Sequence, residues 1–414
     1  MDTFIAAMHQ ASLRRGLQLG LVPALEAMAR QLARTPHPGG STVTAAVLGA
    51  ASRWDYLEQL LWQAPLEEAA ALIVTLAKVA AKQFSHAMSV AASAKGTWST
   101  TGLDATKAVL AGAADLQLQA SEDAIASMMG VGAPADGSGG AGAEGEAPQG
   151  QHRNIGHRAG LLSLGLASWL PAARHMLDCL DEIALAKLVT LAFTHGWTGL
   201  IASIRDLLCT ALDWVPVLVQ AGLLAELQGD ALMAASWNAF VLRGMGPAQL
   251  MRKCATLCQL GVIVRGGPQE RMVVRSAEVL AAVYPQELKQ VSLPDWWQLA
   301  GSEAAAASGA AATPDVLERL MCSPMTAGNM PAGSLTALLP PALVRNRAGV
   351  CANLGCGCIR GPSDRDVPLT VVCSGCRVSR YCSQHCLEQH ASDYDHTPEV
   401  CALIKDAAAD VARK

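Results

Sequence analysis

The chain has 414 residues, more than one hydrophobic core usually organises, so two or more structural units are expected. Half of its residues (51%) are hydrophobic and only 4% are aromatic, which favours packed helices over a β sandwich. The formal net charge of −4 excludes the overall basic field that draws proteins to nucleic acid or anionic lipid.

The N-terminal residues lack the pattern of a secretory signal peptide, because no basic segment precedes an apolar core and a small-residue cleavage site. Apolar runs such as residues 69–77 and 159–173 are shorter than the roughly 18 residues that span a bilayer. We therefore expect an intracellular protein, cytoplasmic or nuclear, with no membrane partner. Residues 1–35 contain arginine and few acids, so an organellar transit peptide is the alternative.

Residues 1–130 form the first predicted helical region. Pro65 with Glu67 and Glu68 is a helix start, because proline fits the first turn and carboxylates suit the positive end of the helix dipole. Apolar residues then recur at helical spacing and predict a core-facing stripe: Ile73, Leu76, Ala80, Phe84 and Met88. Residues 131–151 are rich in glycine, alanine, proline and serine, which predicts a flexible linker.

Residues 152–345 form a second predicted helical region. Within it, residues 262–264 and 272–274 are β-branched or apolar and flank Gly266, Gly267 and Pro268, which predicts one small hairpin near 262–274. Alanine- and glycine-rich residues 301–313, together with residues 331–341, are expected to separate the helical body from the C-terminal segment. The predicted fold class is thus mainly α, a multi-helix body for which a solenoid of stacked helix pairs is one arrangement.

The cysteines are unevenly distributed along the chain. Eight of the thirteen fall within residues 351–401, and such clustering in a chain without a secretion signal indicates metal binding rather than disulfides. Two ligands a few residues apart can bind the same metal ion, because a tight turn directs both side chains to one side. The segment contains four such pairs: Cys351 with Cys356, Cys373 with Cys376, Cys382 with Cys386, and His396 with Cys401.

Eight ligands fill two tetrahedral sites and leave no position for water, which is typical of structural Zn²⁺. Cys382 and Cys386 are four residues apart, so on a helix both would point toward one ion. The segment has few large apolar residues, so we expect two structural zinc ions to supply the stability that burial cannot.

These residues resemble the MYND zinc finger family. The resemblance covers residues 351–401 and rests on Cys373-x2-Cys376-x4-Tyr381-Cys382-x3-Cys386, flanked by an earlier cysteine pair and a later His–Cys pair. It implies a cross-braced finger with two interleaved ligand sets. The first set is Cys351, Cys356, Cys382 and Cys386; the second is Cys373, Cys376, His396 and Cys401.

Some spacings depart from the usual pattern of the family. Four residues separate Cys351 from Cys356, and nine separate Cys386 from His396, so His390 competes with His396 for the seventh ligand position. We favour His396, because the family often has a non-ligand residue at the position of His390. Cys358 is expected to lie outside both ligand sets.

MYND fingers are protein-interaction modules, so the resemblance implies a protein or peptide partner, with residues 379–381 as an edge for strand-like pairing. Leu387 and Ala391 stand where the family commonly has glutamine and tryptophan. Four arginines, six carboxylates, seven thiolates and two Zn²⁺ would give residues 351–401 a formal charge of about −5, so a nucleic acid partner is not expected.

Two other classes of function compete with this one. A lysine methyltransferase relative would require SET motifs beside the finger, and none is found in the sequence; nor is a nucleophile elbow, a phosphate-binding loop or His-Glu-x2-His. We therefore expect no enzymatic activity. RING and HIT fingers are the other cross-braced zinc modules; RING places its histidine near the middle of the ligand series, whereas HIT has a similar ligand order.

Overall fold

The computed structural model describes residues 11–34, 61–93 except 62, 149–289 except 195 and 197, and 338–413 except 395. The mainly α fold class is confirmed. Most of the predicted linker (131–148) and the segments 301–313 and 331–337 lie outside the described residues; residues 149–151 already belong to a helix.

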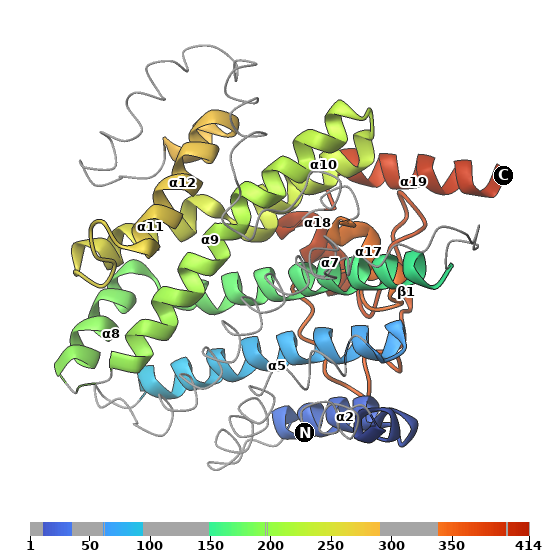
Figure 1. Cartoon of the computed structure of the whole chain (residues 1–414), viewed down its shortest axis with the longest axis horizontal. Helices are drawn as coiled ribbons and strands as arrows, with labels where there is room; N and C mark the ends of the chain where they lie inside the picture. The colour runs from blue at the N-terminus through green and yellow to red at the C-terminus, as the bar shows by residue number, and fades with distance from the viewer. Residues whose placement is uncertain are drawn as a thin grey trace, which may run out of the picture.

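The elements of the described residues, most of them labelled in Figure 1, are thirteen helices and one two-stranded sheet, and residues 11–18 are also helical. They are α2 (Leu21–Arg34), α5 (Leu66–Ser93), α7 (Gln149–Asp178), α8 (Glu182–Thr194), α9 (Thr198–Leu227), α10 (Ala231–Ala239), the π-helix η1 (Phe240–Met245), α11 (Pro247–Gln259), α12 (Pro268–Val283), α13 (Pro285–Leu288), α17 (Pro341–Arg347), β1 (Val371–Val372), β2 (Arg380–Tyr381), α18 (Gln384–Asp393) and α19 (Pro398–Arg413).

Helices α2, α5 and α7 pack one against the next, and α9 crosses α7 and carries α10 and α12 (Figure 1). The predicted helix start at Pro65 is confirmed, since α5 begins at Leu66 with both glutamates in its first turn. Ile73, Leu76 and Ala80 are buried, as their spacing predicts, and the side chains of Phe84 and Met88 lie outside the described ones. The solenoid arrangement stays a prediction.

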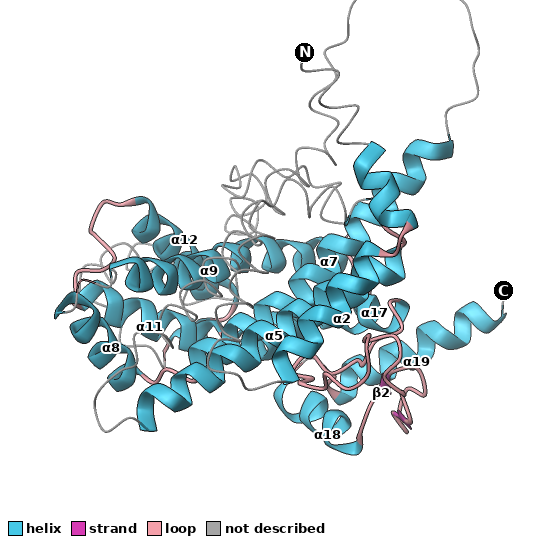
Figure 2. Cartoon of the chain, turned by 90° about the horizontal axis from the view of Figure 1, so that it is seen from below, coloured by secondary structure: helices cyan, strands magenta, loops and turns pink. Residues whose placement is uncertain are grey.

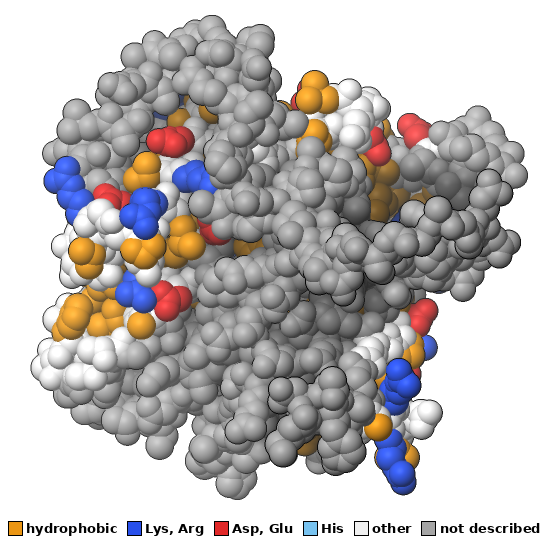
Figure 3. All heavy atoms as spheres, viewed as in Figure 1, with side chains coloured by type: hydrophobic (Ala, Val, Ile, Leu, Met, Phe, Trp, Pro, Cys, Tyr) orange, Lys and Arg blue, Asp and Glu red, His pale blue; other side chains and the backbone are white. Residues whose placement is uncertain are grey.

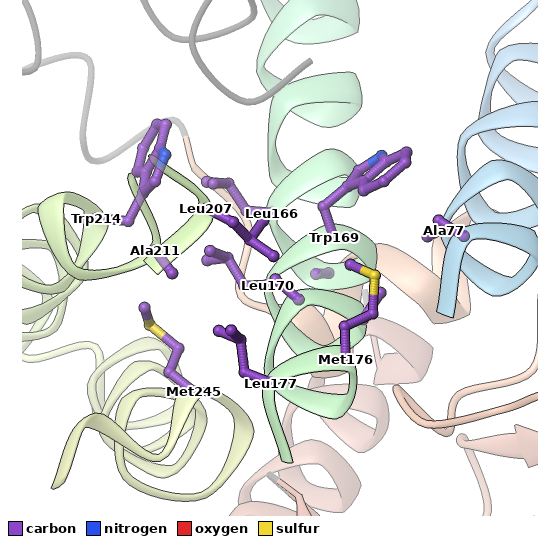
Figure 4. Packing of buried hydrophobic residues seen from close by; sticks show 14 of the residues in the cluster. Ala77, Leu166, Trp169, Leu170, Met176, Leu177, Leu207, Ala211, Trp214 and Met245 are labelled. Carbon is purple, nitrogen blue, oxygen red and sulfur yellow. The ribbon is translucent and has the colours of Figure 1, made fainter. Parts of the chain in front are cut away.

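Helix α7 lies at the centre of the core because both of its sides are covered. Figure 4 shows Trp169 and Met176 directed toward Ala77 of α5, while Leu170 and Leu177 face the side of α9. All of these side chains are buried. A helix that is apolar around its whole circumference is stable only when neighbours cover it, which explains the apolar run at residues 159–173.

Residues Ile204–Leu227 of α9 are long and apolar enough to cross a membrane, although the apolar runs considered from the sequence did not include them. In the structure, 82% of the apolar window is buried against other helices. A mostly buried helix of this kind is also what the core of a soluble protein contains.

The predicted hairpin near 262–274 is wrong, because residues 272–274 lie within α12. The helix begins as helix-start rules require, with Gly267 as an extended N-cap, Pro268 in the first turn and Glu270 near the positive end. Val273, Ser276 and Leu280 then form the buried stripe. A short apolar run favours a strand, whereas the spacing of buried residues over the whole of α12 is helical.

The basic residues around α11 have acidic neighbours. Arg252 Nε lies 3.3 Å from Glu182 Oε1, and Lys253 Nζ lies 3.9 Å from Asp178 Oδ1. On the side where α8, α11 and α12 lie, Figure 3 shows blue and red side chains of the described residues among one another. Arg252 therefore belongs to a mixed surface, as expected of a solvated face, whereas Lys253 is buried beside Asp178.

The cysteine-rich segment, residues 351–401, hereafter the finger, packs directly on the helical body (Figure 2). Leu338 is fully buried, and the Leu339 amide donates to Ser163 Oγ of α7 at 2.8 Å. Leu354 and Ile359 of the finger share one hydrophobic cluster with the body. Apolar side chains on both sides of the junction at residues 338–341 are therefore buried together, and the division into two units stays a prediction.

Candidate metal centres

Two groups of four side chains converge in the finger, and they coincide with the two interleaved sets that the family resemblance implies. The first group comprises Cys351, Cys356, Cys382 and Cys386; the second comprises Cys373, Cys376, His396 and Cys401. Within each group, all candidate ligand atoms lie within 4.8 Å of one another. Each group could hold one metal ion.

The first group joins a loop to the start of a helix. Cys351 and Cys356 lie on the loop after α17, and Cys386 lies in the first turn of α18. Ser383 caps this helix, because its hydroxyl accepts from the Cys386 amide at 3.2 Å. The cap fixes the turn in which Cys382 and Cys386 bring their sulfurs to 3.5 Å from each other.

The second group joins the turn between the two strands to the start of α19. Cys373 Sγ lies 3.6 Å from Cys401 Sγ, and His396 Nε2 lies 3.2 Å from Cys373 Sγ and 3.9 Å from Cys376 Sγ. A Cβ atom on Gly375 would lie 2.6 Å from Cys401 Sγ. Glycine is therefore required between Cys373 and Cys376, since any side chain would displace the fourth ligand.

The sulfur spacings match a tetrahedral ion. With metal–sulfur distances of about 2.3 Å, a tetrahedral centre separates its sulfurs by about 3.8 Å. Two sulfur pairs in the first group, both involving Cys382, are 3.5 and 3.7 Å apart. A disulfide would require about 2.05 Å, and the described cysteines are all free thiols. The geometry is that of ligands around a common centre.

Protons are unevenly shared within each group. Hydrogen bonding to Cys351 lowers the pKa of Cys386 to about 6, and the Cys356 pKa also falls well below its usual value through Cys351. Hydrogen bonding to Cys356 in turn raises the pKa of Cys351. Four crowded thiols cannot all ionise unaided, whereas a divalent cation would stabilise all four thiolates at once.

In the second group, burial opposes ionisation of Cys376, but a hydrogen bond with His396 lowers the Cys376 pKa to about 6. Burial and the neighbouring Cys373 raise the pKa of Cys401 to about 12. Burial disfavours the charged form of His396 and would lower its pKa, but the hydrogen bonds with Cys376 and Cys373 raise this pKa above its usual value. A cation among these ligands would replace the shared protons.

His390 lies outside both groups. It is fully buried, its Nδ1 lies 3.1 Å from Tyr381 Oη, and its ring stacks on His396 with centroids 5.3 Å apart. Tyr381 is also fully buried. The tyrosine of the sequence motif thus supports His390, which in turn packs against the candidate ligand His396.

Cys358 also lies outside both groups. It is half-buried, and its carbonyl accepts from Lys78 Nζ at 3.1 Å. The backbone at this position therefore serves the contact between the finger and α5.

Sequence reasoning missed a buried ionic cluster that holds the finger on the body. This docking cluster consists of Glu26 and Arg30 of α2, Thr75 and Lys78 of α5, and Asp364 of the finger. Asp364 Oδ2 lies 3.0 Å from Arg30 Nη1, and Oδ1 lies 2.5 Å from Lys78 Nζ. Two cations face two carboxylates, so the cluster is neutral overall.

The docking cluster also binds the backbone of the finger. Arg30 donates to the carbonyls of Arg360 and Gly361 at 2.5 and 3.2 Å, and the Asp364 amide donates to Glu26 Oε1 at 2.6 Å. Arg34 donates to the Ile359 carbonyl at 2.6 Å. Residues 359–364 are thereby fixed between α2 and α5. No sequence pattern signals this contact, because its partners are about 300 residues apart.

Comparison of the chain with family models, with curated proteins and with solved structures gave no match.

Proposed function

We propose that the finger binds two zinc ions, one in each group, and that both ions are structural. Seven thiolates and one imidazole are the donors that Zn²⁺ prefers in structural sites. The observation that carries the proposal is the convergence of each set of four ligand atoms within 4.8 Å. Four protein donors per ion leave no open position for water, which supports a non-catalytic role.

The metal assignment is tested by measuring zinc per chain in the purified full-length protein by mass spectrometry. Wild type is expected to contain two zinc ions, and His396→Ala one. His390→Ala and Cys358→Ser are matched controls from the same segment and should keep two, because neither residue belongs to a group. Fewer than one zinc in wild type, or equal loss in both histidine variants, would contradict the assignment.

We further propose that the protein acts through protein–protein interaction and that the finger, held by the helical body, carries the binding surface. One side of the finger contacts α2 and α5, so the side formed by β1 and the outer face of α18 is left for a partner. Val372 of β1 is 45% exposed, and Gln384 and Glu388 of α18 are also exposed. An apolar residue among polar ones suits a binding surface.

The edge expected at residues 379–381 is unsuitable for strand pairing. Ser379 and Tyr381 are buried, and the Arg380 carbonyl already accepts from the Ala352 amide at 2.9 Å. In the sheet, Val371 pairs with Tyr381 and Val372 with Arg380. The outer side of β1 is therefore the edge that we propose for a partner strand.

The interaction proposal is tested with Val372→Asp in the full-length protein. We expect this variant to lose the proteins that co-purify with wild type in quantitative mass spectrometry, while keeping two zinc ions. Leu227→Asp is the control, because Leu227 is equally apolar and more exposed (76%) but lies at the end of α9. The proposal fails if the two variants lose the same proteins or if neither loses any.

A further inference from the structure

The loop that carries Cys351 and Cys356 of the first candidate metal group is held by the helical body. Arg345 Nε of α17 donates to the Cys351 carbonyl at 2.9 Å, and α17 packs on α7. Lys78 Nζ of α5 donates to the carbonyl of Cys358 at 3.1 Å. Both donor side chains are buried. The backbone around the first group is therefore fixed by contacts that do not involve the second group.

The second group depends on α19 for its fourth ligand. Cys401 lies near the start of this helix and is half-buried. Among the described side chains of α19, only Val400 and Ile404 are buried, and they belong to a hydrophobic cluster against which Leu232 of α10 packs. Helices of this length are marginal in water unless they pack. Two buried side chains are a small anchor, so a metal ion bound by Cys401 would contribute much of what holds the start of α19.

His396 lacks an outer hydrogen bond that a metal-bound histidine usually makes. It is 4% exposed, and its Nε2 lies 3.2 Å from Cys373 Sγ. The other ring nitrogen, Nδ1, is buried and has no hydrogen-bond partner within the described part of the chain. Histidine ligands almost always donate this second N–H, and removing its acceptor typically weakens metal binding by roughly 10- to 100-fold. Cys376 does accept from the Ser379 amide at 3.5 Å, so the weakness of the second group lies with His396.

The two groups also differ in charge. The first offers four thiolates to a divalent cation, whereas the second offers three thiolates and a neutral imidazole. One negative charge fewer means a weaker Coulomb attraction for the ion. Charge and outer hydrogen bonding therefore both favour tighter binding in the first group.

We propose that the second group is an exchangeable zinc site, which loses its ion before the first group does and thereby releases α19 from α10. The inference rests on the proposed function, because it requires that both groups bind zinc. The docking cluster includes no residue of α19, so residues 359–364 stay on α2 and α5 when the second ion leaves. The finger then responds to the concentration of free zinc, with α19 as the element that moves.

The proposal is tested on the full-length, zinc-loaded protein with the chromogenic chelator pyridylazoresorcinol as the competitor for zinc. We expect zinc to leave in two steps whose affinities differ at least about tenfold. Hydrogen exchange by mass spectrometry, after removal of one zinc equivalent, then shows which group is empty. Exchange should become faster at the start of α19, in residues 398–405, and should stay slow in α18 and in residues 359–364.

Two variants assign the steps, although the exchange experiment on wild type depends on neither. His396→Ala should release a single zinc ion with the affinity of the second step of wild type, and should show fast exchange in residues 398–405 even when zinc-loaded. Cys258→Ser changes a half-buried cysteine of α11 outside both groups and should keep both steps.

The outcomes separate this proposal from the proposed function. Fewer than one zinc ion in wild type would contradict the proposed function itself. Two ions that are released with equal affinity would overturn only the exchangeable site. So would a first release that speeds exchange in residues 359–364 rather than in α19.

Discussion

Replacing Asp364 by asparagine should release the finger from α2 and α5. The carboxylate of Asp364 is 1% exposed and contacts two buried cations, Arg30 at 3.0 Å and Lys78 at 2.5 Å. Burial alone would lower the pKa of Lys78, yet Cys356 and Asp364 raise it, so its ammonium is charged in the folded protein. The Asp364→Asn substitution would remove the carboxylate that Arg30 and Lys78 share, which is the costly way to break a buried ion pair.

The cost of removing one partner of a buried pair is about 3 to 5 kcal/mol. We expect the lower end, about 3 kcal/mol, because Glu26 remains 3.7 Å from Arg30 and the carbonyls of Arg360 and Gly361 still accept from it. Asp366→Asn is the control, since Asp366 is exposed on the same loop; its effect should stay within about 0.5 kcal/mol.

Urea unfolding of the zinc-loaded protein, followed by far-ultraviolet circular dichroism, measures the change in free energy. Hydrogen exchange by mass spectrometry then locates it, with faster exchange expected in residues 359–364 and in α2. Adding Lys78→Met to Asp364→Asn should recover part of the loss, because the double variant no longer buries that ammonium without its carboxylate. Equal stability of the Asp364→Asn and Asp366→Asn variants would refute the reasoning.

Three further predictions concern the finger itself. Gly375→Ala should lower the zinc content from two ions to one, because its Cβ would lie 2.6 Å from Cys401 Sγ, whereas Gly357→Ala, with no atom within 4 Å, should keep both; equal zinc contents would contradict this. Tyr381→Phe should cost about 1 kcal/mol in urea unfolding, since it removes the hydrogen bond to His390, and should leave zinc binding unchanged; loss of zinc would assign the histidine a larger role. Chelation should unfold the finger, which depends on about 10 to 16 kcal/mol of apparent binding free energy per ion, while α9 keeps its protection from hydrogen exchange; an unchanged exchange pattern would exclude a structural role for the metal.

The spacing of cysteine and histidine along the sequence predicts most of the candidate metal site. Residues such as Cys382 and Cys386 are close in sequence, so local turn and helix geometry alone brings their sulfurs together. The resemblance supplied the interleaving of distant pairs, and the structure shows the same two groups. The resemblance also favoured His396 over His390, and the structure agrees, because the fold directs His390 to Tyr381.

Helical periodicity likewise predicted the class of fold and the start of α5, since apolar spacing and helix-start residues act within a few turns. The prediction from local pattern is wrong at residues 262–274, because a run of three apolar residues is compatible with a helix as well as with a strand. The Gly267-Pro268 start and the longer buried stripe of α12 decided that segment.

The sequence by itself determined a mainly helical protein with a cysteine-rich segment of metal-ligand spacing, because both features depend on residues that are neighbours along the chain. Only the tertiary structure decided that the finger is seated on α2 and α5 through Asp364. A buried Asp364 requires cationic partners, and these come from residues about 300 positions earlier in the sequence. Only the packing of the helices determines which residues they are.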